Sequence, residues 1–69
     1  MDTIARVREL ADAQDMTMYR LAQISGISMT TIRMAERRGG QLKIDTIEQI
    51  CRALGITLSA FFADQDTEG

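Results

Sequence analysis

Four side chains of one short stretch fall in a single row if that stretch is helical. The stretch reads ISGISMTTIRMAERRGG, residues 24–40, and the row consists of Thr30, Arg33, Met34 and Arg37, because residues three and four apart are neighbours on a helix. Arginine offers a fork of hydrogen-bond donors, threonine a hydroxyl, and methionine a soft apolar surface. This row has the chemistry needed to contact base edges or phosphates.

The composition favours one small globular domain and excludes several kinds of site. The chain has 69 residues, no His and a single Cys, Cys51, so it lacks the commonest general base, a disulfide framework and a thiolate zinc site. Paired carboxylates and a glycine-rich phosphate cradle are also missing. We therefore expect no enzyme, no cofactor, no metal and no small-molecule substrate.

The predicted location of the protein rests on the absence of a membrane-spanning segment and of a signal peptide from the sequence. No apolar run approaches the roughly 20 residues of a membrane span. The first ten residues, MDTIARVREL, are charged throughout and contain no signal-peptide core. We expect a cytoplasmic protein with no membrane partner.

Positive charge is concentrated locally although the net charge is −2. Residues 28–43 contain one acid, Glu36, and four basic residues, namely Arg33, Arg37, Arg38 and Lys43. A local basic patch matters more for nucleic-acid binding than the sum of charges. Three acids lie in the last six residues. We predict a domain over residues 1–63 and an acidic, flexible tail over residues 64–69, either simply solvated or repelling DNA.

Helix start and stop signals predict an all-α chain with five helices. Asp2 or Thr3 can cap the first helix, and Gly26 and Gly55 suit the ends of the second and fourth. A Ser or Thr N-cap between two staple residues occurs three times, in the triples Met16-Thr17-Leu21, Ile27-Ser28-Ile32 and Ile56-Thr57-Phe61. Strand signals are absent. Cys51 and Phe61 are expected in the core, and Phe62 either in the core or at a dimer contact.

Two of the predicted helices have the spacing of a helix-turn-helix. They run from Met18 to Ser25 and from Met29 to about Arg38, with a short glycine-containing turn between them. In such a unit the second helix enters the major groove with its N-terminal residues at the base edges. We predict base contacts from Ser28, Met29, Thr30, Arg33 and Met34, with guanine as a partner for Arg33 and thymine methyl groups for the methionines. Phosphate contacts are predicted from Arg37, Arg38 and Lys43.

Each of these residues also has a plainer interpretation. Arg33 can be an ordinary solvated arginine. Met29 and Met34 can fill the edges of the core, because Met adapts to irregular gaps. The basic residues that follow can form a charged loop with no ligand.

The segments MTMYRLAQISGISMTTIRMAE and IDTIEQICRALGITLSAFF resemble the Cro- and phage-repressor-type (XRE-like) helix-turn-helix family, from Ile4 to Phe62. The resemblance implies a compact five-helix lambda-repressor-like DNA-binding domain in which helices 2 and 3 form the helix-turn-helix. It implies a transcriptional regulator that represses or activates transcription, and we predict a repressor. Such a protein binds an inverted-repeat operator in double-stranded DNA as a homodimer. The resemblance also implies phosphate contacts from Thr17 and Met18. The neighbouring Tyr19 is predicted either to reach a phosphate or to cover the surface of its own helix.

The chain departs from the pattern of the family in three ways. Met18 stands where many members have Gln, and Gly39-Gly40 replaces the usual loop. Ala11 stands where members commonly have an Arg that pairs with the acid at Glu36, so Glu36 is expected to lack its partner. These departures keep open a second function, a protein-interaction module of the same fold, antitoxin-like or co-regulatory. Its partner would bind a Met-rich face formed by Met18, Met29 and Met34.

Overall fold

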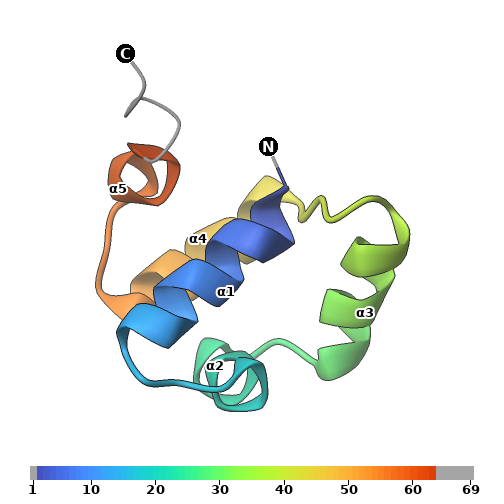
Figure 1. Cartoon of the computed structure of the whole chain (residues 1–69), viewed down its shortest axis with the longest axis horizontal. Coiled ribbons are helices and arrows are strands. Elements are labelled where there is room, and N and C mark those ends of the chain that lie inside the picture. Colours follow the sequence, from blue (N-terminus) through green and yellow to red (C-terminus); the bar gives the residue numbers. More distant parts are fainter. Residues whose placement is uncertain (1, 64–69) are drawn as a thin grey trace.

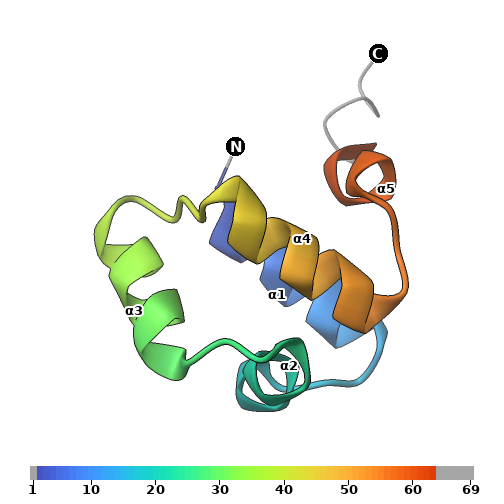
Figure 2. The same cartoon turned by 180° about the vertical axis from the view of Figure 1, so that it is seen from behind.

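The computed structural model describes residues 2–63 (Figures 1 and 2). Within this range the chain is helical and has no strand, which confirms the predicted fold class. The helices are α1 (Thr3–Ala13), α2 (Met18–Ser25), α3 (Met29–Arg37), α4 (Ile44–Leu54) and α5 (Leu58–Phe62). Figure 1 shows α3 and α5 at opposite ends of the long axis, with α1 and α4 between them. The predicted acidic tail, residues 64–69, lies outside the described residues.

Local capping determines where the helices begin. Four of them begin after a side chain that accepts a hydrogen bond from the first-turn backbone, the caps being Asp2, Thr17, Ser28 and Thr57. The three predicted staple caps are therefore confirmed. α4 follows Lys43, whose side chain makes no capping bond. No helix of the described residues is long and apolar enough to cross a membrane.

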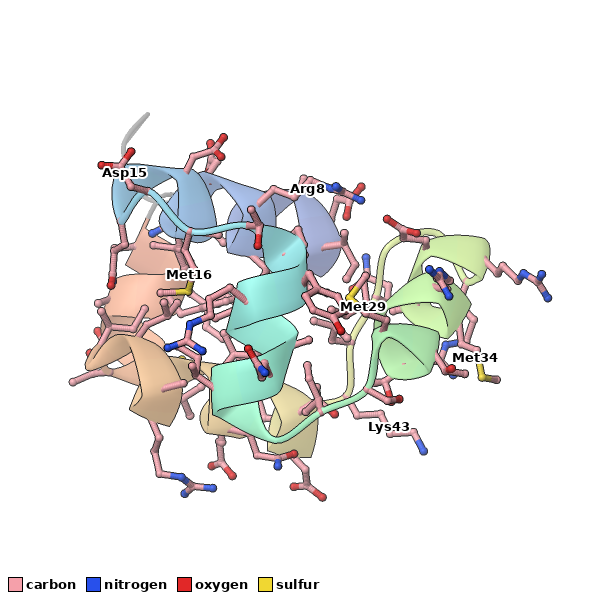
Figure 3. All side chains as sticks on the ribbon, turned by 90° about the horizontal axis from the view of Figure 1, so that it is seen from below. Arg8, Asp15, Met16, Met29, Met34 and Lys43 are labelled. Atoms are coloured by element: carbon pink, nitrogen blue, oxygen red, sulfur yellow. The ribbon has the colours of Figure 1, made fainter. Side chains whose placement is uncertain are left out.

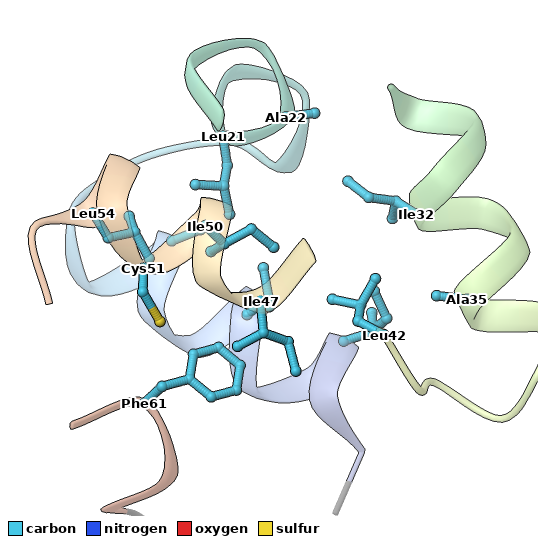
Figure 4. Close-up of a cluster of buried hydrophobic side chains, with 13 residues drawn as sticks. Leu21, Ala22, Ile32, Ala35, Leu42, Ile47, Ile50, Cys51, Leu54 and Phe61 are labelled. Carbon is cyan, nitrogen blue, oxygen red and sulfur yellow. The ribbon is translucent and has the colours of Figure 1, made fainter. Parts of the chain in front are cut away.

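The apolar stripes of all five helices meet in one core (Figure 4). α3 contributes Ile32 and Ala35, and α5 contributes the fully buried Phe61. Cys51 is also buried, which confirms its predicted core position, and burial together with the nearby Glu48 raises the pKa of its thiol. Phe62 is half-buried and packs edge-on against Phe61, with ring centroids 4.9 Å apart.

The first helix is tied to the last by one arginine. Arg6 Nε donates to the carbonyl of Phe61 at 2.6 Å, and Arg6 Nη2 donates to that of Ala60 at 3.0 Å. These carbonyls lie at the C-terminal end of α5, where side chains can supply donors to the last carbonyls of a helix. α5 has only five residues, too few to be stable alone, so Arg6 and the buried Phe61 hold it in place.

A second polar contact ties the α3–α4 loop to the start of α1. The hydroxyl of the buried Thr3 donates to the carbonyl of Gly40 and accepts from the backbone N–H of Leu42, both at 2.7 Å. The N–H of Ile4 donates to the same Gly40 carbonyl at 3.0 Å. Gly40 has φ +87°, and a β-carbon there would overlap the carboxylate of Asp2. The loop therefore needs glycine at this position.

We expect Thr3→Val to lower the free energy of unfolding by about 1–3 kcal/mol, because it leaves the buried Leu42 N–H without an acceptor while preserving side-chain shape. Urea denaturation followed by circular dichroism measures the change. Thr3→Ser keeps the hydroxyl and serves as the control, with a smaller loss. A Thr3→Val protein as stable as the parent would show that the tie contributes nothing.

Within residues 2–63, the one buried side-chain oxygen or nitrogen without a hydrogen-bond partner is Ser25 Oγ, in the last turn of α2. Removing this hydroxyl relieves a desolvation cost, so we expect Ser25→Ala to raise the free energy of unfolding by about 1 kcal/mol. Ser59→Ala, at an exposed position of α5, is the matched control for helix propensity alone. Equal gains from the two variants would refute a cost at Ser25.

Candidate nucleic-acid interface

α2 and α3 form the helix-turn-helix that the spacing predicts. α2 ends at Gly26, whose φ of +74° reverses the chain, and the N–H of Ile27 donates to the Ala22 carbonyl at 3.1 Å. Ser28 then caps α3. Ala22 and Ile32 are both buried and lie on the inner sides of the two helices (Figure 4). The small side chain at position 22 lets the two helices pack at this corner.

The outer side of α3 carries the predicted row. Thr30, Arg33 and Arg37 are exposed, and Met34 keeps 52% of its surface accessible. Figure 3 shows Met34 pointing away from α1 and α2. The inner side carries Ile32 and Ala35, which are buried. The structure thus brings these four predicted contact residues onto one exposed surface.

Of the three methionines Met18, Met29 and Met34, only Met34 lies on that surface. Met18 and Met29 are half-buried and pack against the core. Figure 3 shows Met29 on the side of α3 nearer α2, whereas Met34 points to the other side. Met29 lines a shallow hollow between α2 and α3 together with Tyr19, which is 70% exposed.

The two predicted hydroxyl contacts also serve as helix caps. Thr17 Oγ1 accepts from the N–H of Arg20 at 3.0 Å. Ser28 Oγ accepts from the N–H of Thr31 and lies 3.2 Å from Thr31 Oγ1. A capping oxygen is committed to its own helix, so it is less available to an external donor. The sequence analysis does not include Thr31 among the contact residues. Its position three residues after a capping serine is a usable signal for its contact with that cap.

Seven of the eight basic residues separate into two groups, and the eighth, Arg52, is an exposed residue of α4. Arg6, Arg8 and Arg20 are engaged by the α5 carbonyls, Glu36 and Gln23 respectively. In the described part of the chain, no carboxylate lies within ion-pair distance of the basic residues at the end of α3 and in the loop. These are Arg33, Arg37, Arg38 and Lys43, and all four are exposed.

A hollow of about 330 Å³ separates α3 from the start of α4. Arg38 and Lys43 line it together with Thr31, Met34 and Thr46. Figure 3 shows the Lys43 side chain extending outward at this end of the molecule. Two cations and two hydroxyls around one hollow suit an anion such as a phosphate.

Glu36 lacks an arginine partner at position 11, as the sequence indicates, but it has another partner. Arg8 Nη2 donates to Glu36 Oε2 and forms an ion pair between α1 and α3. Arg8 precedes Ala11 by three residues, so the two positions are neighbours on one face of α1. The missing arginine is thus replaced from the preceding turn. The side chains of Arg8 and Glu36 are 52% and 39% exposed.

The comparisons with known proteins give one match. A family model described as helix-turn-helix matches residues 4–61, which is most of the chain. Comparison with curated proteins gave no match, and neither did comparison with solved structures.

We expect the Arg8–Glu36 pair to contribute about 0.2–1 kcal/mol to folding, because both side chains are partly solvated. A double-mutant cycle with Arg8→Ala and Glu36→Gln, measured by urea denaturation, gives this coupling energy. The coupling energy should decrease when the NaCl concentration is raised from roughly 0.05 to roughly 1 M, because salt screens exposed ion pairs. Coupling that is absent at low salt, or unchanged at high salt, contradicts the expectation.

Proposed function

We propose that this chain, which belongs to the Cro/C1-type helix-turn-helix family, is a transcriptional repressor that binds a specific operator in double-stranded DNA. The family is a DNA-binding one, so binding to DNA is the shared property. The finer proposal is that α3 lies in the major groove of an inverted-repeat operator and that the protein binds as a homodimer. A cytoplasmic location and a binding role without catalysis accord with this function.

The observation that carries the proposal is the position of the uncommitted positive charge. Four exposed arginine and lysine side chains without a carboxylate partner in residues 2–63 occur between Arg33 and Lys43, on α3 and the loop after it. The cations elsewhere on α1 and α2 are engaged by groups of the protein itself. The charge is therefore available where a helix-turn-helix meets DNA.

The geometry suggests how the contacts divide. The row of Thr30, Arg33 and Met34 is the exposed part of α3 with access to base edges, and Ser28 and Met29 flank it at the turn. Arg37, Arg38 and Lys43 follow toward the hollow beside α4, where the sugar-phosphate backbone would pass. Contacts to phosphate fix the register, and contacts to bases select the sequence. At the start of α2, Thr17, Met18 and Tyr19 would face a second phosphate.

The homodimer follows from the size of the module. One helix-turn-helix reads one half-site, and dimers of such units place two recognition helices about one helical turn apart on the DNA. A single small module buries too little surface for a tight specific complex. Two copies on an inverted repeat double the contacts, which supports the proposed dimer.

The alternative of a partner protein on a Met-rich face has less support. Met18 and Met29 pack against the core and only Met34 of the three is well exposed. That alternative needs the three methionines on one face, and in the structure they lie on different surfaces.

We expect selection from random duplex DNA to enrich an inverted repeat. Fluorescence anisotropy on the selected duplex should show that Arg33→Ala weakens binding at one defined base pair by about 5- to 100-fold. Arg38→Ala and Lys43→Ala should weaken binding to all sequences and each reduce the salt slope by about 0.9.

Arg52→Ala is the matched control, since Arg52 is an exposed arginine of α4 with no carboxylate within ion-pair distance among residues 2–63. It should leave affinity and salt slope unchanged. Absence of any enriched sequence, or an equal loss from Arg52→Ala, would overturn the proposed interface.

A further inference from the structure

We infer that α3 reads a guanine next to a pyrimidine that carries a C5-methyl group, so that thymine and 5-methylcytosine are equivalent at that position. The inference rests on the proposed function and specifies the DNA chemistry that the site would select. It follows from the side chains that α3 exposes and from those that it lacks.

The first step is to list the polar side chains of α3 that could form hydrogen bonds with base edges. Amide side chains pair with adenine, and carboxylates accept from cytosine N4. Residues 28–35 contain neither type. The one acid of α3, Glu36, is held by Arg8. Ser28 caps the helix and Arg37 is assigned to phosphate, so the exposed polar side chains that remain for base contact are the hydroxyl of Thr30 and the guanidinium of Arg33. A guanidinium pairs best with guanine O6 and N7.

The second step concerns the apolar reader. Met34 is 52% exposed and points away from α1 and α2 (Figure 3), whereas Met29 packs against the core. In the major groove, the apolar group that a base edge offers is the methyl group at C5 of thymine, and 5-methylcytosine carries the same group at the same atom. A thioether distinguishes these pyrimidines from uracil and cytosine by surface contact rather than by hydrogen bonding.

The third step is spacing. Arg33 and Met34 are consecutive residues on the exposed side of α3. Consecutive side chains of an α-helix point about 100° apart, so the ends of two long side chains such as these diverge by more than the rise of about 3.4 Å between base pairs. The two side chains can therefore contact different base pairs, and the methyl-bearing pyrimidine would lie beside the guanine that Arg33 contacts.

The test uses the duplex enriched by selection, in which Arg33→Ala identifies the guanine that Arg33 contacts. Four probes differ only at the base pair that holds the neighbouring pyrimidine. The probes carry thymine or uracil opposite adenine, and 5-methylcytosine or cytosine opposite guanine. We expect the two methylated probes to bind with similar affinity. Removing the methyl group should weaken each by about four-fold, which corresponds to about 0.8 kcal/mol for one buried methyl.

Met34→Ala should abolish the difference between methylated and unmethylated probes. Ile44→Ala is the matched control, because Ile44 is an equally exposed apolar residue, at 53%, outside α3. It should leave that difference intact. Both substitutions are at exposed positions, and circular dichroism verifies that each variant folds.

The failures of the two proposals are distinguishable. An enriched motif whose four probes bind alike, or whose methyl preference survives Met34→Ala, overturns the methyl inference and leaves the repressor proposal standing. The inference is also overturned if the thymine probe binds tightly but the 5-methylcytosine probe binds as weakly as the cytosine probe. The group recognised would then be the O4 acceptor of thymine. If selection enriches no sequence, the proposed function itself is wrong.

Discussion

The position of α3 depends on how its two ends are fixed, because its own buried surface is small. Only Ile32 and Ala35 of this helix are buried. The Gly26 turn joins the start of α3 to α2, and the loop after its end is tied to the buried hydroxyl of Thr3. The Arg8–Glu36 pair adds a third link, to α1. A helix with only two buried residues is thereby oriented by backbone and polar bonds, and the side chains on its outer side do not pack against the core.

Some arginines of this protein are bonded to groups of the fold, and others remain exposed on α3 and the loop after it. Arg6 satisfies carbonyls of α5, and Arg8 neutralises the one acid of α3. Without Arg8, the carboxylate of Glu36 would stand beside the cations that follow it and would oppose an approaching phosphate. Pairing within the fold therefore makes the outer surface of α3 more positive than the sequence suggests. A net charge of −2 is compatible with an anion-binding face for this reason.

Signals confined to a few consecutive residues could be predicted from the sequence. Thr17, Ser28 and Thr57 each cap a helix as expected, because a cap depends on neighbours within four residues. Periodicity also placed Thr30, Arg33 and Met34 on one face. It could not show that Met29 packs against the core, because Met29 is the first residue of α3 and periodicity does not fix which flank of the first turn faces inward. The Arg8–Glu36 pair joins residues 28 positions apart, and only the three-dimensional packing of α1 on α3 brings them together.

The bond between Arg6 and Phe61 spans 55 positions, and this separation has a consequence for how the chain acquires its structure during synthesis. The core needs Phe61 beside residues of α1 and α4, so the N-terminal helix emerges long before its final partner is made. Until then the core residues of α1 lack one of their partners, and closing the loop to Phe61 costs conformational entropy. On the ribosome, the domain can be completed only after α5 has left the exit tunnel.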